Sequence, residues 1–297
     1  MRTFLLLSLL LFLPYAHAQK MDELRKRLHA YVDTLDATTV GVAVITAEDD
    51  SLTVNNDIRY PMMSVFKFHQ ALALSDYMAG KHLPLETRIR IKPEDLQLKG
   101  TWSPLRDKYP NGGVELTIAD LMTYTLRQSD NLACDILFDR FMPPKAVDAF
   151  IKKQGIDDVS IQYNETAMSI DHDLCYGNWS TPYSAALLVD RFIDKKIVGD
   201  PYFTFIRDLM LGCATGTSRL AQPFKGQARQ LGHKTGSGYV NEKGEIVACN
   251  DIGFILSANG DKRYVIAVFV RESGLPEKAT EKIIATISGM VKAALLK

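Results

Sequence analysis

The chain has 297 residues, with 35 Lys and Arg against 35 Asp and Glu, and 46% of its residues are hydrophobic. This length and apolar content suffice to bury a large core, either in one domain or in two lobes that share an interface. The balanced charge argues against a nucleic-acid partner and against electrostatic attachment to a membrane surface.

The first residues have the pattern of an export signal. Arg2 precedes an apolar run from Phe4 to Leu13. The small residues Ala16 and Ala18 then mark a cleavage point before Gln19. The run is shorter than the roughly 20 residues that span a bilayer, and no cysteine follows the cleavage point to accept a lipid. We therefore expect cleavage near Ala18 and a periplasmic or secreted protein without a membrane anchor.

The start of the mature chain combines a helical pattern with a β pattern. Apolar residues recur at helical spacing from Met21 to Leu35, which predicts an amphipathic helix. Two β-rich stretches follow, Val40 to Ala47 and Ser51 to Val54. The polar residues 48–50 between them suit the turn of a hairpin.

The middle of the chain, from Ser64 to about Leu211, is predicted mainly as helices broken by turns. The first helix is expected to run from Ser64 to Ala79 and to be stopped by Gly80. Two further helix starts carry the capping box and Thr-Pro patterns, at Thr117 with Asp120 and at Thr181 with Pro182.

Strand patterns return near the end of the chain. They cover Ala228 to Thr235, Ile246 to Leu256 and Arg263 to Val270, and turn residues 259–261 join the last two. An amphipathic helix is predicted after Pro276.

Both ends of the chain thus supply helices and strands, whereas the middle supplies helices. We expect an α/β lobe formed by residues 19–61 and 216–297, in which terminal helices flank an antiparallel sheet. An all-α lobe, residues 62–215, is inserted into it. Ligand sites are favoured at the boundary between two such lobes.

The cysteines and histidines do not have the spacing of a metal or redox site. The four cysteines contain no CxxC pair, and we expect no required disulfide among Cys134, Cys175, Cys213 and Cys249. The histidines that lie nearest the motifs show no HExxH or other ligand spacing, namely His69, His172 and His233. We therefore expect neither a metal nor another cofactor.

Ser64 and Lys67 form a Ser-x-x-Lys pattern at the predicted start of a helix. One helical turn brings the hydroxyl and the amine onto the same face, so the amine can take the hydroxyl proton. The N-terminus of the helix also directs backbone N–H groups toward an oxygen that becomes negative during acyl transfer. Alone the pattern is weak, because about one match is expected by chance in a chain of this length.

Two tripeptides accompany this pair. Ser129-Asp130-Asn131 lies between helical stretches, where a loop can present the serine hydroxyl and the asparagine amide while the aspartate pins the turn. Lys234-Thr235-Gly236 ends a β pattern, and a glycine there lets a ligand approach the strand edge. Each also fits an ordinary turn. The three motifs in this order, however, are expected by chance in roughly one of several hundred chains.

With these motifs the sequence resembles the class A serine β-lactamases, over nearly the whole mature chain. The resemblance implies that Ser64 is the nucleophile and that Lys67 is its general base or proton shuttle. It also implies that Ser129 passes a proton to the ring nitrogen and that Asn131 holds the side-chain amide of the substrate. Small-molecule β-lactams are then the partners, and we expect a monomer.

The same resemblance implies how the rest of the substrate is held. Lys234 and Thr235 would bind its carboxylate. The backbone N–H groups of Ser64 and Ser237 would form the oxyanion hole. Arg219, which precedes the last motif, either adds a second cation for the carboxylate or is an ordinary surface arginine. Trp102 could line the mouth of the cleft, but a packed aromatic is the role that we expect.

Glu165 separates this interpretation from two alternatives. Penicillin-binding D,D-peptidases share the three motifs but release a β-lactam acyl group slowly, and a non-catalytic β-lactam sensor binds without turnover. In the class A pattern a glutamate in the Ω-loop activates the water that hydrolyses the ester. Glu165, within the polar stretch from Ser160 to Ser180, matches that position.

Two departures from the family pattern suggest a divergent branch. Met168 and Ser169 stand where most members have Leu and Asn. Asp135 stands where most have an asparagine that ties down the Ω-loop, and an acid that faced Glu165 would repel it or share a proton with it. Both features resemble a cephalosporinase-like or extended-spectrum branch.

Overall fold

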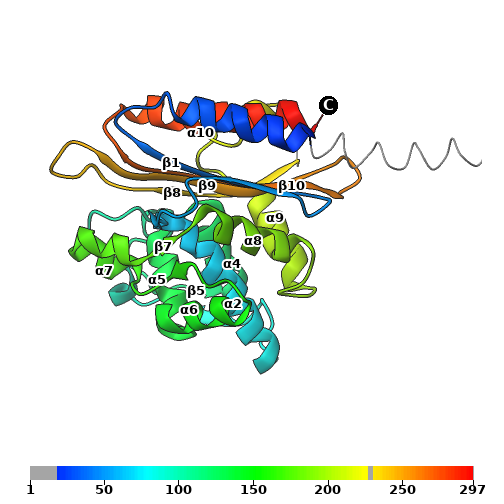
Figure 1. Ribbon diagram of the computed structural model, residues 1–297. Coiled ribbons are helices and arrows are strands. Elements are labelled where there is room, and N and C mark those ends of the chain that lie inside the picture. The colour runs from blue at the N-terminus through cyan, green and yellow to red at the C-terminus, as the bar shows by residue number, and fades with distance from the viewer. Residues whose placement is uncertain (1–18, 227–229, 297) are drawn as a thin grey trace, which may run out of the picture.

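A five-stranded antiparallel sheet forms the centre of the computed structural model, which describes residues 19–226 and 230–296 (Figure 1). The strand order is β2-β1-β10-β9-β8, so the two ends of the chain meet in one sheet. The expected antiparallel sheet flanked by terminal helices is confirmed. The strands are β1 (Thr39–Thr46), β2 (Ser51–Val54), β8 (Leu231–Ser237), β9 (Ile246–Leu256) and β10 (Lys262–Ser273).

The terminal helices lie side by side on one face of this sheet (Figure 1). They are the helix at residues 19–32 and α10 (Glu277–Leu295). Alternate residues of β1, such as Val42 and Val44, share their apolar cluster, because side chains of a strand alternate between its faces. The first helix was predicted to reach Leu35 but ends at Val32. Leu35 contacts the same cluster from the turn that follows. Its position therefore has the spacing of a helical residue although it lies outside the helix.

The helical region covers the other face of the sheet (Figure 1). Its α8 contacts three strands of the sheet, β1, β9 and β10. The layers approach closely at Gly41 of β1, where there is no room for a side chain. A Cβ at Gly41 would lie 2.6 Å from the ring of Tyr60 and 2.7 Å from Pro182. The longer helices are α2 (Phe66–Lys81), α4 (Ile118–Arg127), α5 (Asn131–Arg140), α6 (Pro144–Lys153), α8 (Pro182–Ile193) and α9 (Tyr202–Leu211).

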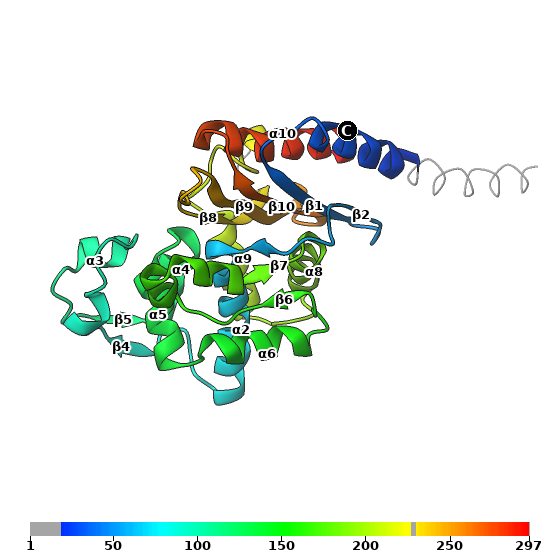
Figure 2. The same ribbon diagram turned by 60° about the vertical axis from the view of Figure 1, so that its left-hand side comes forward.

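Short elements join these helices, and Figure 2 shows α3, β4 and β5 together at one end of the helical region. The short strands are β3 (Tyr60–Pro61), β4 (Arg88–Arg90), β5 (Glu115–Thr117), β6 (Val159–Ser160) and β7 (Trp179–Ser180). The short helices are α3 (Pro104–Lys108) and α7 (Glu165–Ile170), with 3-10 turns η1 (Met63–Val65), η2 (Pro93–Leu96), η3 (His172–Gly177) and η4 (Gln222–Phe224). Because β7 pairs with both β3 and β6, both ends of the loop that holds α7 are fixed beside the start of η1.

Several predicted boundaries are confirmed and others are wrong. Thr117 and Asp120 form the expected capping box, and Thr181 caps α8. The first central helix does not stop at Gly80. It continues to Lys81 and ends where His82 adopts a left-handed conformation, with φ of 54°. Glycine is the usual residue at such a helix end, but it is not required there.

The last strands differ slightly from their predicted bounds. The predicted start of β8 at Ala228 lies outside the described residues, and the strand continues to Ser237. β10 runs three residues past Val270 because its pairing with β9 continues to Ser273. The predicted export signal also lies outside the described residues. Among residues 19–226 and 230–296, no helix has the length and apolar character needed to cross a membrane.

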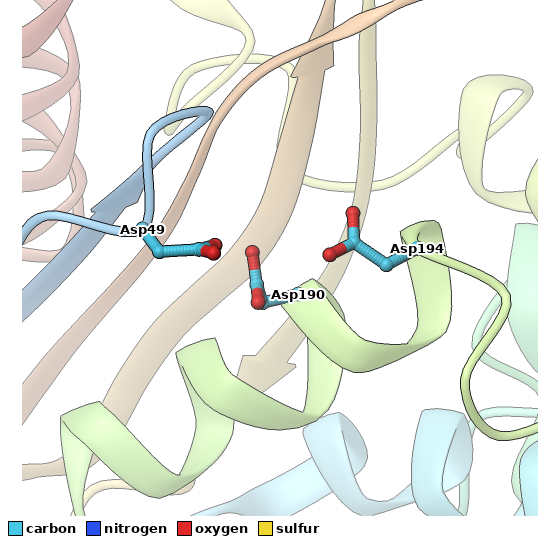
Figure 3. A group of neighbouring side chains, drawn as sticks. All are labelled: Asp49, Asp190 and Asp194. Carbon is cyan, nitrogen blue, oxygen red and sulfur yellow. The ribbon is translucent and has the colours of Figure 1, made fainter.

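A cluster of three aspartates lies where α8 meets the sheet (Figure 3). The ammonium of Lys262, from β10, already fills the space between them. It lies 2.8 Å from Asp190 Oδ1, 3.0 Å from Asp194 Oδ1 and 3.8 Å from Asp49 Oδ1. The lysine thus occupies the centre of the cluster and offsets part of its negative charge, and its ion pair with Asp190 links α8 to β10.

Candidate active site

Ser64 lies at the meeting point of the sheet and the helical region. It sits in η1, directly before α2, and the preceding Met63 has a positive φ of 46°. The edge strand β8 packs directly against this turn. A Cβ on Gly236 of β8 would lie 2.3 Å from the carbonyl oxygen of Met62, closer than any side chain permits. Gly236 is thus required by the close approach of β8 to the serine turn.

Ser64, Lys67 and Glu165 form a contiguous polar group. Lys67 Nζ donates a hydrogen bond to Ser64 Oγ at 2.9 Å and lies 2.8 Å from Glu165 Oε1. The Ser64 hydroxyl is 3.3 Å from the same carboxylate oxygen, to which it donates. The expected juxtaposition of serine and amine on one helical turn is therefore present, and a carboxylate reaches both groups.

The ammonium of Lys67 is fully buried and surrounded by oxygen atoms. Besides Ser64 and Glu165, it donates to the backbone carbonyl of Ser129 at 2.9 Å and to Asn131 Oδ1 at 2.6 Å. A buried charge is tolerated only when such partners replace its water shell. These contacts hold the amine at the serine hydroxyl.

The loop between α4 and α5 presents Ser129. Ser129 has a positive φ of 57°, which is unusual for a residue with a side chain. Asp130, which is fully buried, holds this turn, as predicted from the sequence. It accepts hydrogen bonds from the backbone N–H groups of Ala133 at 2.8 Å and Leu105 at 2.6 Å.

Asn131 follows the Ser129 turn, and its backbone N–H donates to the Trp102 carbonyl at 3.1 Å. The Asn131 amide donates to Thr101 Oγ1 at 2.7 Å, and its oxygen accepts from Lys67. Trp102 is 60% exposed, and its indole N–H donates to the Gln128 carbonyl at 2.8 Å. The prediction that Trp102 packs as a buried aromatic is wrong.

Lys234 connects β8 to the Ser129 loop. Its Nζ donates to Ser129 Oγ at 2.8 Å and to the Thr235 carbonyl at 2.9 Å. Burial, with a further contribution from the positive charge of Lys67, lowers the pKa of Lys234 to about 7. Its amine can therefore exchange a proton near neutral pH.

Arg219 is not a surface residue, so that alternative from the sequence is wrong. It is 4% exposed and forms an ion pair with Glu281 of α10 at 3.0 Å. Its terminal nitrogen donates to Ser237 Oγ at 2.7 Å. Thr235 lies nearby, and its hydroxyl is 2.6 Å from that of Thr215. The guanidinium thus reaches the site through Ser237.

Asp135 holds the start of α7, the short helix that begins with Glu165. Its two oxygens accept from the backbone N–H groups of Glu165 at 2.8 Å and Thr166 at 2.7 Å. Asp135 thus ties down the loop through its backbone, and the expected repulsion is also present, because the negative charge of Glu165 contributes to raising the pKa of Asp135. Burial raises the pKa of Asp135 to about 7.

Asn178 is a site-forming residue that the sequence analysis did not identify. It is fully buried, and its oxygen accepts from the backbone N–H groups of Gln162 at 2.7 Å and Tyr163 at 3.0 Å. Its amide donates back to the Tyr163 carbonyl at 2.8 Å. These bonds close the neck of the loop that carries Glu165. An asparagine in a polar stretch gives no sequence signal for this role.

A cavity of about 680 Å³ adjoins the Glu165 loop. Ser169 lines it, together with residues of the turn that joins β8 to β9. The rings of His172 and Tyr239 approach to 4.4 Å between their centroids and connect the two segments. The loop and the turn after β8 thus line this cavity, whereas Ser64, Lys67 and Glu165 do not.

The site contains two pairs of a serine and a buried lysine, Ser64 with Lys67 and Ser129 with Lys234. The Glu165 carboxylate contacts the first pair. This arrangement is typical of the serine hydrolases that are acylated by β-lactams. The chain belongs to the β-lactamase enzyme family, whose sequence model matches residues 23–295. It is a class A serine β-lactamase, which hydrolyses β-lactams and confers resistance to these antibiotics.

Relatives and solved structures agree with this assignment. A β-lactamase of Phocaeicola vulgatus is 38% identical over 87% of this chain and 80% of its own length. Beta-lactamase VEB-1 of Pseudomonas aeruginosa is 37% identical over 95% and 93%. The crystal structure of TLA-3 extended-spectrum beta-lactamase superposes with a TM-score of 0.89 at 37% identity, covering 93% of this chain and 99% of that one. These findings favour the hydrolase over the D,D-peptidase and sensor alternatives.

Proposed function

We propose that the Lys67 ammonium first passes a proton to Glu165, and that the neutral amine then takes the Ser64 proton as Ser64 attacks the β-lactam carbonyl. One observation carries this proposal: Lys67 Nζ lies 2.9 Å from Ser64 Oγ and 2.8 Å from Glu165 Oε1. Proton transfer requires hydrogen-bonding distance between the nucleophile and its base. Opening of the four-membered ring then leaves an ester on Ser64.

Ser129 then delivers a proton to the ring nitrogen that leaves. The support is its position between two lysines, because its carbonyl accepts from Lys67 and its hydroxyl accepts from Lys234. A hydroxyl held by an amine of pKa about 7 can receive a replacement proton from that amine.

The substrate carboxylate binds to Lys234 and Thr235, which present an ammonium and a hydroxyl at the end of β8. The backbone N–H groups of Ser64 and Ser237 form the oxyanion hole. Arg219 strengthens this region through Ser237 Oγ, at 2.7 Å, rather than by open exposure of its own charge. Asn131 holds the amide of the acyl side chain.

Glu165 activates the water that hydrolyses the ester, and Ser169 supplies the second water ligand. The Glu165 carboxylate lies beside Ser64 Oγ, where such a water attacks the acyl carbon. We infer that bulky side chains of extended-spectrum substrates extend toward the cavity of about 680 Å³ that Ser169 lines. Two relatives are named as extended-spectrum β-lactamases: TLA-3, which has the same overall fold, and PER-1, which is 30% identical in sequence.

We also infer that the mature protein begins near Gln19, is exported, acts as a monomer on small molecules and binds no nucleic acid. The support is the apolar segment after Arg2 and the balanced charge of the chain. We propose that residues 19–61 and 216–297 form its α/β lobe and residues 62–215 the inserted lobe, with Ser64 near their junction; the inserted lobe is not all-α as expected, because it contains the short strands β4 to β7.

Replacement of Glu165 by Gln tests the deacylation step. With a chromogenic cephalosporin, we expect steady-state hydrolysis to fall roughly 10²- to 10⁴-fold, the usual contribution of a general base. Mass spectrometry of the stopped reaction should then detect an acyl adduct on Ser64. Ser64→Ala should form no adduct, and Glu23→Gln, on the exposed face of the first helix, should behave as wild type. Glu165→Gln with wild-type turnover would assign the base to another residue.

A further inference from the structure

A second group of reactive side chains lies on β8, next to the site but outside it. His233 directly precedes Lys234, and the side chains of successive strand residues point to opposite faces. His233 Nδ1 lies 2.9 and 3.0 Å from the two carboxylate oxygens of Asp251 on β9. Asp251 also accepts from the backbone N–H of Leu220 at 3.1 Å. The carboxylate thus fixes the imidazole.

Cys213 completes this group. It follows the end of α9 and lines the same cavity as His233, whose positive charge acts on its thiol. Burial alone raises the pKa of the Cys213 thiol, but the charges of His233 and Lys234 lower it to about 7. Burial lowers the pKa of His233, whereas Asp251 and Cys213 raise it, with a net rise well above the ordinary value. The two side chains therefore form a thiolate and imidazolium pair near neutral pH.

The other cysteines lack such a partner environment. Cys134, Cys175 and Cys249 are buried, and burial raises the pKa of each thiol. The values are about 11 for Cys175 and about 12 for Cys249. A thiol of raised pKa is a poor nucleophile, so this comparison singles out Cys213.

A cavity gives access to the Cys213 and His233 pair. It has a volume of about 220 Å³, and both residues line it together with Thr217, Phe224 and Lys225. Cys213 is partly exposed, unlike the other three cysteines. The cavity wall combines a nucleophile, the group that can hold its proton, and the cation of an exposed lysine.

We propose that Cys213 is a modification site for low-molecular-weight disulfides, with His233 as the proton-holding group and Asp251 as its anchor. The thiolate attacks one sulfur of the reagent, a new bond forms to Cys213, and the disulfide bond of the reagent breaks. The departing thiolate leaves with the electron pair and takes the proton held by His233. The Cys213 sulfur is oxidised and the departing sulfur is reduced, so no further reactant is needed.

The modification is coupled to the substrate site through two threonines. Cys213 Sγ lies 3.4 Å from Thr215 Oγ1, which lies 2.6 Å from Thr235 Oγ1. An adduct on the sulfur disturbs the first of these contacts and fills the cavity beside it. This part of the inference rests on the proposed role of Thr235 in binding the substrate carboxylate. We expect KM to rise about 2- to 10-fold, corresponding to one weakened hydrogen bond, with a smaller change in kcat.

Oxidised glutathione tests the site, with 4,4′-dithiodipyridine as the probe for rates. At pH 7 we expect one glutathionyl adduct per molecule, located on Cys213 by peptide mapping, and thiol reaction at least about 10-fold faster than at any other cysteine. Cys213→Ser should lose the fast reaction, whereas the matched variant Cys249→Ser should keep it. Unmodified Cys213→Ser should hydrolyse a chromogenic cephalosporin as wild type does.

The pH dependence of the fast reaction provides a second test. The charged groups that face Cys213 are His233 and Lys234 of β8, Asp251 of β9 and Lys225 at the cavity. We expect the rate to reach half its maximum near pH 7, and His233→Asn to move this midpoint toward the ordinary thiol value.

Three results would overturn the inference: mapping of the wild-type adduct to another cysteine, no adduct at all, or a midpoint at the ordinary thiol pKa. An unchanged KM in the adduct would overturn the coupling to Thr235. Hydrolysis by the unmodified wild type is measured in the same experiment. Its absence would count against the proposed function and leave the thiol chemistry to be judged by the mapping alone.

Discussion

Both carboxylate oxygens of Asp135 bind the first turn of α7, and one of them accepts from the backbone N–H of Glu165 at 2.8 Å. The acid on α5 thus positions the carboxylate on the facing loop without touching it. Two N–H groups at the start of a helix favour a negative partner. Burial opposes the charge and raises the pKa of Asp135 to about 7.

We predict that Asp135 makes the stability of the enzyme depend on pH. Because the folded pKa of about 7 exceeds the unfolded value, the folded state holds more protons between about pH 4 and pH 7. The contribution of Asp135 is therefore present below about pH 4 and is lost as the pH rises through 7. The free energy of unfolding of wild type, minus that of Asp135→Asn, should fall over this range in urea titrations. A difference that is constant or rises with pH would contradict the prediction.

Lys234 should control the basic limb of the pH profile. Its pKa is lowered to about 7, mainly by burial, so the ammonium that we propose binds the substrate carboxylate is lost above this pH. We expect kcat/KM for a cephalosporin to decline above about pH 7, since this ratio reports the free enzyme. Lys234→Arg keeps its charge and should flatten this limb, at lower absolute activity. If kcat/KM of Lys234→Arg declines above pH 7 as in wild type, another group causes this decline.

The sequence predicted the fold because its signals are local and periodic. The β-rich run of residues 40–47 forms β1, which is buried on both faces, and the helical spacing after Pro276 forms α10, which covers the sheet. Ends of elements were less predictable. The helix at residues 19–32 was predicted to reach Leu35 because Leu35 is apolar at helical spacing, but Leu35 contacts the core from the turn that follows the helix.

The site was predictable where short motifs fix the geometry. Ser64 and Lys67 are one helical turn apart, so their contact follows from the sequence. Contacts between distant segments were not predictable. Arg219 was uncertain because its partner Glu281 lies on α10, and the hydrogen bonds of Asp135 were not foreseen because its partners are backbone groups. Side-chain identity gives no signal for a backbone partner.

Asn178 should be essential for the loop that carries Glu165. Asn178→Ala removes hydrogen bonds to Gln162 and Tyr163 at a fully buried position. We expect the free energy of unfolding to fall by about 2 to 4 kcal/mol, given the usual net contribution of each bond and the cost of groups left unpaired. Urea denaturation measures this change. The acyl-enzyme should also persist longer in mass spectra, because Glu165 is less well held.

Asn164→Ala is the matched control for that variant. Asn164 caps α7 through one bond, to the Ala167 N–H at 2.9 Å, so its loss should cost only about 1 kcal/mol. Equal effects of the two variants would mean that the neck of the loop does not depend on Asn178.

The last prediction concerns the contact between β8 and the serine turn. In Gly236→Ala, the new methyl group would lie 2.3 Å from the Met62 carbonyl oxygen, and this neighbour is backbone that cannot rotate away. β8 must therefore move away from η1, which displaces Lys234 and Ser237 relative to Ser64. Because a displacement of about 1 Å in an active site costs roughly 100-fold in rate, we expect a loss of that order in kcat/KM.

Gly80→Ala is the control, since nothing lies within 4 Å of its Cβ position on α2, and alanine should stabilise this helix by up to about 1 kcal/mol. Steady-state kinetics and thermal unfolding of both variants measure the two effects. Full activity in Gly236→Ala would mean that β8 has room to shift without disturbing the lysine and serine that it presents.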